Sequence, residues 1–370
     1  MRPTPRPRPT HARGLALPWL LALLVFAGAL AALPLGVTNP YLLHVMILIF
    51  LAVVQGESWN VIGGYTGQYS VGHSAFFGIG GYAALLLVAH HAPLWWGFLV
   101  PMAAAVAVGI VTGSITFRLR GPYFVLASIA VAEILRLAAL NWKEVTNGAE
   151  GMLLSDVPAL RIAGWTITDW STKAPFYYAA LVLAGITIAV NWGVQHSKLG
   201  YYFQAIREDQ DAAHSLGIPL TRYKNVALAI SAFFTACSGA FYALYVGFVD
   251  PPTVLSVEVS VQFVLVCIIG GIGTIGGPVV GALVLIPLSE ALRANILSDL
   301  LFRLGVVREG SPAGAFLKEN LAHAHALIYG ILVVIVILFM PDGVLGFVRQ
   351  RLRRRAPAAA PSGPAAGGVA

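Results

Sequence analysis

The chain has 370 residues, of which 58% are hydrophobic and only 11% are charged, and its mean hydropathy is +0.79. A soluble domain carries about 25% charged residues, so this composition excludes an ordinary soluble protein and indicates a membrane protein. The net charge of +7 does not indicate nucleic-acid binding, because the Lys and Arg residues lie at the ends of apolar segments.

The chain begins with a basic, proline-rich segment, 1–14, that we predict to be disordered. The apolar run 15–35 exceeds the ~7–15 residues of a signal-peptide core, which favours a retained first span. The further candidate spans are 40–55, 75–90, 94–117, 122–141, 175–193, 225–247, 258–270, 278–294 and 325–341. The predicted fold is an all-α polytopic membrane domain over 15–347, with about 8–10 transmembrane helices. A basic and then low-complexity tail follows at 348–370 and is also predicted to be disordered.

The distribution of positive charge predicts how the domain is oriented. With a cytoplasmic N-terminus and ten spans, the cytoplasmic segments hold 15 Lys and Arg residues and the outer segments hold 6. Both termini and a loop at about 194–224 are therefore expected in the cytoplasm, and a loop at about 142–174 on the outer side.

The most charged short run is 203–217, FQAIREDQDAAHSLG, which lies within the expected cytoplasmic loop. Its apolar residues are spaced as on one face of a short helix: Phe203, Ile206, Ala213 and Leu216. An amphipathic helix between spans is either an interfacial segment or a docking site for a soluble partner.

Two glycine-rich stretches predict broken or re-entrant helices. The first, 60–82, combines seven glycines with polar residues, and either tight helix packing or the lining of a permeation path would explain it. Its candidate permeation residues are Gly64, Gly67, Gln68, Ser70, His73 and Ser74. The second, 269–281, formally contains GxGxxG, but its neighbours are membrane spans rather than strands. We therefore expect a helix break there, with Pro278 opening the next helix.

Glu133 and Arg136 lie three residues apart within the span 122–141. Charges inside a membrane are costly, so this spacing predicts an ion pair. Glu133 is a further candidate for the permeation path, and a role in proton coupling is the less favoured interpretation.

Catalytic and metal-binding patterns are missing from the sequence. No GxxxxGK[ST] phosphate loop occurs, so the chain is not expected to bind ATP in that way. The histidines are not spaced as metal ligands, and the two cysteines lie in apolar runs. We expect no cofactor, no metal and no enzymatic activity in this chain.

Several motifs resemble one family, the LivM-type permease subunit of bacterial ABC importers for branched-chain amino acids. The motifs are NVIGGYTGQYSVGHSAFFGIGGYAALL (60–86), RLRGPYFVLASIAVAEILR (118–136), TNGAEGM (146–152), AIREDQDAAHSLGI (205–218), VCIIGGIGTIGGPVVGALV (266–284) and MPDGVLG (340–346). Importer permeases carry a cytoplasmic EAA-xxx-G loop that docks into the ATPase, and Asp211, Ala212, Ala213 and Gly217 match it, with aspartate in place of glutamate. With the flanking Arg207 and Glu208, these residues are the expected ATPase-coupling residues.

The resemblance implies an assembly in the bacterial inner membrane. A second, LivH-type permease would complete the pore, two ATPase subunits would bind ATP and Mg, and a periplasmic binding protein would deliver the substrate. Related permeases also carry urea, amides and other small solutes, so the resemblance does not select the substrate. The alternative from the residues alone is an ion-coupled secondary transporter, which the broken helices and Glu133 would suit. A membrane-embedded enzyme has only scattered histidines in its favour.

Overall fold

The computed structural model describes residues 39–154, 161–162, 165–166 and 173–293, together with 25, 28–36 and isolated positions between 330 and 351. This part is almost entirely helical, as predicted. The helices at predicted spans are α2 (Pro40–Trp59), α3 (His73–Ala89), α4 (Leu94–Thr116), α5 (Pro122–Asn141), α7 (Ala174–Gln195), α10 (Leu220–Val246), α12 (Val257–Gly270) and α13 (Gly276–Arg293). The predicted spans 15–35 and 325–341 and the two terminal segments lie largely outside the described residues.

Within the described residues, six helices are long and apolar enough to cross a membrane, while α3 and α13 are apolar but shorter. The span predicted at 40–55 extends ten residues further than expected. α2 continues to Trp59 and passes into a π-helix, η1 (Asn60–Tyr65), so that Pro40–Tyr65 is one span of 26 residues. The polar residues Gln55 and Glu57 do not end the helix, because both side chains are buried inside the protein.

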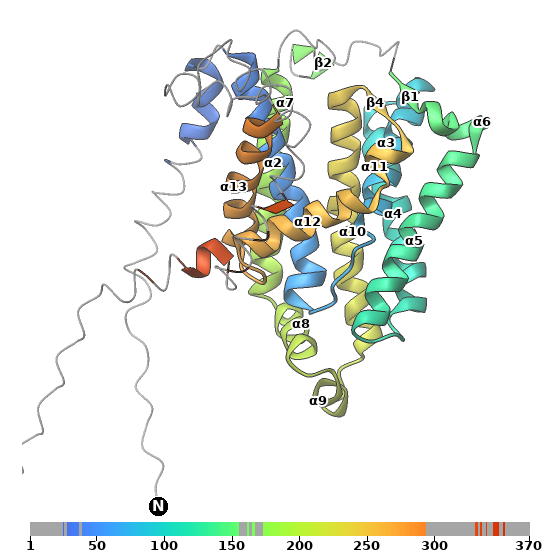
Figure 1. Cartoon of the computed structure of the whole chain (residues 1–370), viewed down its shortest axis with the longest axis vertical. Coiled ribbons are helices and arrows are strands. Elements are labelled where there is room, and N and C mark those ends of the chain that lie inside the picture. Colours follow the sequence, from blue (N-terminus) through green and yellow to red (C-terminus); the bar gives the residue numbers. More distant parts are fainter. Residues whose placement is uncertain are drawn as a thin grey trace, which may run out of the picture.

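The spans run side by side, and the shorter elements gather at the two ends of the bundle (Figure 1). At one end lie α8 (Lys198–Glu208) and α9 (Gln210–Ser215). The elements after α5 and after α10 are α6 (Lys143–Thr146), η2 (Gly148–Glu150), β1 (Met152–Leu153), β2 (Arg161–Ile162), β3 (Trp165–Thr166), β4 (Phe248–Val249) and α11 (Pro251–Val254). α6 and β1 lie at the end opposite α8 and α9. The described residues of the loop 142–174 and of the loop 194–224 therefore lie at opposite ends of the bundle.

The strands are short and add two pairings to the helical bundle. β1 pairs with β4 in antiparallel register, with Met152 opposite Val249, and β2 pairs with β3. The first pairing fastens the loop that follows α5 to the segment that follows α10.

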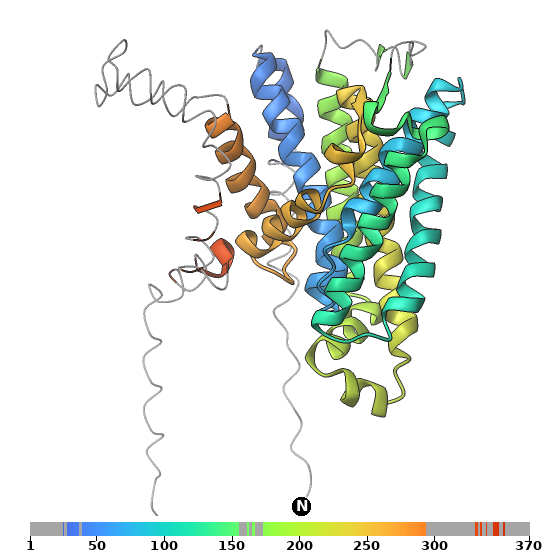
Figure 2. The ribbon, with the colours of Figure 1, turned by 45° about the vertical axis from the view of Figure 1, so that its right-hand side comes forward.

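The core of the bundle is built on α2 and α10. The most apolar stretch is 89% buried in α2 and 72% buried in α10, but only 28% buried in α4 and 22% buried in α5. α3 approaches α10 at glycine positions, because a Cβ on Gly80 would collide with the carbonyl oxygen of Ala236, and one on Gly239 with that of Phe77. Glycine at these positions lets two backbones touch. The outward faces of α4 and α5 are not covered by the other described residues (Figure 2).

α12 and α13 form a helical hairpin, and α12 runs obliquely across the bundle. The turn between them begins at Gly271 and Gly273, which both have positive φ, and Pro278 lies in the first turn of α13. This confirms the predicted helix break in the second glycine-rich stretch. A Cβ on Gly281 would collide with the carbonyl oxygen of Val266, so glycine lets the two helices pack closely.

Candidate coupling and permeation site

The segment 203–217 folds as two helices, so the prediction of a single short helix there is wrong. Asp209 separates them with an extended backbone, φ −155° and ψ 114°. Its carboxylate caps α9 by accepting hydrogen bonds from the backbone N–H groups of Asp211 and Ala212, at 2.8 and 3.0 Å. Aspartate favours such a cap over a mid-helix position, because its side chain competes for backbone donors.

The predicted apolar stripe is confirmed at three of its four positions. Phe203, Ile206 and Ala213 are buried, whereas the side chain of Leu216 is 81% exposed, which corrects the prediction for that residue. The break at Asp209 gives α9 its own rotation about the helix axis. Helical spacing counted from α8 across Asp209 therefore does not predict which side chains share a buried face. Leu216 is thus an apolar residue presented to solvent at the tip of the bundle.

Gly217 follows the C-terminal end of α9. Its φ of +83° belongs to the left-handed region that favours glycine. The N–H of Gly217 donates to His214 O at 2.9 Å, and the N–H of Ile218 donates to Ala213 O at 3.1 Å. This pair of bonds is a Schellman motif, which fixes the direction in which the chain leaves α9.

Three other predicted coupling residues, Glu208, Asp211 and Ala212, are exposed. Asp211 forms an ion pair with Arg120 of the α4–α5 turn at 2.9 Å. Both side chains are more than half exposed, so this pair orients α9 but contributes little to stability.

Arg207 differs from these residues because its guanidinium group reaches into the bundle. Its Nη1 donates a hydrogen bond to the carbonyl oxygen of Gly64 in the π-helix η1 at 2.8 Å. A Cβ on Gly67, which has φ +68°, would lie 3.2 Å from the Arg207 side chain, and one on Gly273 would collide with its guanidinium group. The coupling segment thus touches both glycine-rich stretches through one residue.

Asn60 joins the same two stretches to each other. Its Nδ2 donates to Thr274 O at 3.0 Å, and its Oδ1 accepts from the N–H of Gly273 at 2.9 Å. The end of α8, the π-helix η1 and the α12–α13 turn therefore meet at one junction. The contacts of Arg207 and Asn60 with backbone groups thus connect α8 to the π-helix at the end of the span Pro40–Tyr65 and to the α12–α13 turn.

The remaining polar candidates of the first stretch lie inside the bundle. His73 is fully buried, with Nδ1 3.0 Å from Ser70 Oγ and Nε2 2.7 Å from Ser231 Oγ of α10. Ser74 is also buried, and its N–H donates to Ser260 Oγ of α12 at 2.8 Å. These contacts join α3 to α10 and α12.

Gly67 and Gln68 line a cavity of about 540 Å³ together with the start of α5 and Gln210 of α9. Gln68 itself is buried, and its Nε2 donates to Thr66 O at 3.2 Å. The structure thus brings the first-stretch candidates together along one buried seam, with an opening near the coupling segment.

Glu133 and Arg136 form the predicted ion pair on α5, with Arg136 Nε 2.8 Å from Glu133 Oε2. The Glu133 side chain is 39% exposed. Its hydrogen bonds in the described residues go to Arg136, whereas Ser128 of the same helix contacts the first glycine-rich stretch by accepting from the N–H of Val71 at 2.9 Å.

Sequence reasoning missed a buried polar pair between α2 and α7. Asn191 Nδ2 donates to Glu57 O and to Glu57 Oε2, at 2.8 and 2.6 Å, and both residues are fully buried. In the described part of the chain no salt bridge reaches Glu57. The signal available in the sequence was a carboxylate and an amide within apolar spans, which are costly there unless bonded.

A polar cavity between α2, α12 and α13 was also missed. It has a volume of about 310 Å³, and Gln55, Gln262 and Ser289 contribute to its wall. These residues are far apart in the sequence, so their spacing could not show that they line one cavity.

Transport permeases typically combine interrupted helices with buried polar residues inside the bundle. This chain has both features, and a charged segment contacts them at one end. The family model for the permease component of branched-chain amino acid transport systems matches residues 40–340. The chain belongs to this family and is the permease subunit of an ABC importer, a multi-pass protein of the inner membrane.

Its relatives include the high-affinity branched-chain amino acid transport permease LivM of Salmonella typhimurium. The two are 28% identical over 355 residues, which cover 90% of this chain and 76% of the relative. LivM of Escherichia coli is 28% identical over 361 residues, 92% of this chain and 77% of the relative. LivH of Escherichia coli is 23% identical over 328 residues, 82% of this chain and 96% of the relative. No solved structure matches the chain.

Proposed function

We propose that this permease carries branched-chain amino acids, or a related small neutral or zwitterionic solute, into the cell. A second, LivH-type permease, two ATPase subunits and a periplasmic binding protein complete the proposed assembly. ATP and Mg are bound by the ATPases, and this chain contributes coupling and permeation without a cofactor of its own. Both termini and the α8–α9 segment lie in the cytoplasm, in keeping with the excess of Lys and Arg there.

The contact of Arg207 with Gly64 supports this proposal most strongly. It links α8, the segment that would be moved by an ATPase, to the π-helix with which the span Pro40–Tyr65 ends. A coupling element needs a partner on one side and a bistable element on the other. The π-helix and the α12–α13 turn supply the second requirement.

The docking surface for the ATPase is the outward face of the coupling segment. Leu216 supplies an apolar anchor, and Glu208 and Asp211 supply charges beside it. A central apolar residue within a charged rim is the usual arrangement of a protein–protein contact.

The permeation path runs along the uncovered face of α5, where the second permease closes it. Glu133 and Arg136 are partly exposed at the surface of this single chain. A charged pair within a span is costly against lipid, so it faces a partner subunit or water in the assembly. The seam that contains His73 and Gln68 then forms the wall behind this path.

The proposal is tested with the complete assembly reconstituted in proteoliposomes, where ATP-driven uptake of radiolabelled leucine is expected. Uptake driven equally well by an ion gradient without the ATPases would contradict it. Leu216→Asp is expected to reduce co-purification of the ATPases by about ten-fold or more, because it charges the apolar anchor of the contact.

The matched control is Leu153→Asp, an exposed leucine in β1 at the other end of the bundle. This control should leave ATPase co-purification unchanged. Unaltered ATPase binding in the Leu216 variant would reject the assigned docking surface, even if uptake itself were confirmed.

A further inference from the structure

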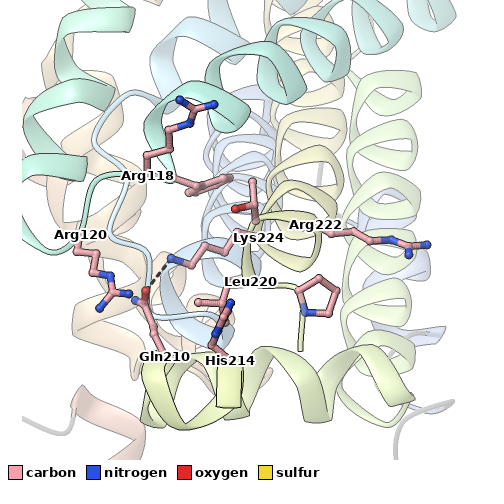
Figure 3. A pocket seen from close by; sticks show the side chains of 10 residues that line it. Arg118, Arg120, Gln210, His214, Leu220, Arg222 and Lys224 are labelled. Carbon is pink, nitrogen blue, oxygen red and sulfur yellow. Dashed lines mark hydrogen bonds between the residues drawn. The ribbon is translucent and has the colours of Figure 1, made fainter. Parts of the chain in front are cut away.

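A basic cavity lies between α9 and the ends of the neighbouring spans (Figure 3). Its volume is about 520 Å³. Arg118 and Arg120 come from the α4–α5 turn, and Arg222 and Lys224 from the first turns of α10. The ten residues that line it, all within the described part of the chain, include no aspartate or glutamate.

Lys224 is the buried member of this group, with only 2% of its surface exposed. Its Nζ donates to Gln210 Oε1 of α9 at 2.8 Å and lies 5.8 Å from the centre of the Phe117 ring. In the described residues no carboxylate lies within salt-bridge distance of Lys224. A buried ammonium group without a counter-ion is unfavourable, so the cavity attracts an anion.

Among the described residues, one carboxylate forms a salt bridge with a cation of the cavity, namely Asp211, which pairs with Arg120. Arg118, Arg222 and Lys224 are therefore left with three positive charges around one cavity, and His214 lies at its α9 side. Figure 3 shows the Arg118 and Arg222 side chains extending in different directions from Lys224, so the cations lie on several sides of the cavity. Guanidinium and ammonium groups match the acceptor oxygens of a phosphate group.

The position of the cavity favours a lipid as the source of that phosphate. It lies where α4 ends, α5 begins and α10 begins, which is the level of the phospholipid headgroups for a chain that crosses the membrane. Exposed apolar side chains stand beside the arginines, including Ile115, Leu119 and Tyr123, and would contact acyl chains. α9 lies across the other side of the cavity, so a soluble partner would meet α9 first.

We propose that this cavity binds the phosphate group of an anionic phospholipid from the cytoplasmic leaflet. Basic pockets between transmembrane helices on that side are typical headgroup sites. The bound phosphate would join the α4–α5 turn, α9 and α10, and so hold the coupling segment against the spans. The leaflet assignment rests on the orientation given under the proposed function.

The test measures lipid binding by native mass spectrometry on the purified full chain in a neutral detergent. Phosphatidylglycerol, phosphatidylcholine and inorganic phosphate are the three probes. The variant is Arg118→Gln with Arg222→Gln, since both side chains are exposed and their loss leaves the buried Lys224 in place. The control is Lys198→Gln with Arg351→Gln, which removes the same charge from exposed positions outside the cavity.

Phosphatidylglycerol is expected to bind the native chain more tightly than phosphatidylcholine. The cavity variant is expected to bind phosphatidylglycerol about ten-fold more weakly than the native chain, because two positive charges of the cavity wall are lost. The control variant should bind as the native chain does. Equal binding of both lipids, or equal weakening in the control, would overturn the proposal. Binding of inorganic phosphate alone would identify a site for a free anion instead.

Loss of ATPase co-purification in the cavity variant, with lipid binding unchanged, would assign the cavity to an acidic segment of the ATPase and also overturn the proposal. A melting temperature equal to that of the control shows that the variant folds. Lipid binding is measured without partner subunits, so its failure is distinct from a failure of leucine uptake.

Discussion

At the scale of single residues, Arg207 and Leu216 divide the work of the coupling segment. Arg207 points into the bundle and bonds to a backbone carbonyl, whereas Leu216 points to solvent. Under the proposed function, Arg207 transmits movement of the coupling segment to the spans, and Leu216 contacts the ATPase. Sequence patterning placed both residues in one predicted helix and could not separate these roles.

Replacing Arg207 is expected to uncouple transport while the ATPases stay bound. A charged hydrogen bond contributes about 1.5–3 kcal/mol, and the partial exposure of this side chain puts the expected effect at the low end. Arg207→Gln should lower leucine uptake by about ten-fold. Uptake and ATPase co-purification are measured on the same preparation.

Lys198→Gln, on the exposed side of the same helix, is the control for this substitution and should leave both values unchanged. If uptake by the Arg207 variant equals that of the control, the contact with Gly64 does not transmit movement.

At the scale of elements, the contact between α3 and α10 depends on glycine rather than on large apolar side chains. Gly80 and Gly239 let the two backbones meet, and His73 bonds to Ser231 across the same interface. In a membrane the hydrophobic effect does not drive helices together, so close packing and internal hydrogen bonds must do so. This contact holds α3 against the core of the bundle.

Gly239→Ala is expected to destabilise the protein, because the new methyl group would collide with the Phe77 carbonyl oxygen. Overpacking of this kind costs about 1–3 kcal/mol. Thermal unfolding in detergent should show a lower melting temperature for this variant.

Gly185→Ala in α7 is the matched control, since no atom lies within 4 Å of the added Cβ. It should be neutral or slightly stabilising, because alanine is the better helix former by about 1 kcal/mol. Equal melting temperatures for both variants would show that α3 and α10 are not held at this contact.

At the scale of the whole molecule, the two ends of the bundle carry different features. The coupling segment and the basic cavity lie at one end, and the β1–β4 pairing lies at the other. The uncovered face of α5 lies between them along the side of the bundle. Under the proposed function, the end with the coupling segment binds the ATPases, and the side with α5 faces the second permease.

The orientation is tested by cysteine labelling after Cys237 and Cys267 have been replaced by alanine. Lys198→Cys in α8 should react with a membrane-impermeant maleimide only in inside-out vesicles, and Lys143→Cys in α6 only in right-side-out vesicles. Both positions are exposed, so access depends on the side of the membrane. The reverse pattern would invert the proposed topology.

The sequence by itself determined the membrane class, the positions of eight helices in the described part and the break at the second glycine-rich stretch. The length of apolar segments, the positions of glycines and the distribution of charge are local properties of a chain. Span length and charge directly determine which segments cross a bilayer and how they are oriented.

Only the tertiary structure decided the split at Asp209, the exposure of Leu216, the reach of Arg207 to Gly64 and the pairing of Glu57 with Asn191. Arg207 and Gly64 are 143 positions apart, and Glu57 and Asn191 are 134 apart. Such contacts follow from how the spans pack against one another, which no local spacing records. The basic cavity likewise exists only because two separate turns and α9 meet at one end of the bundle.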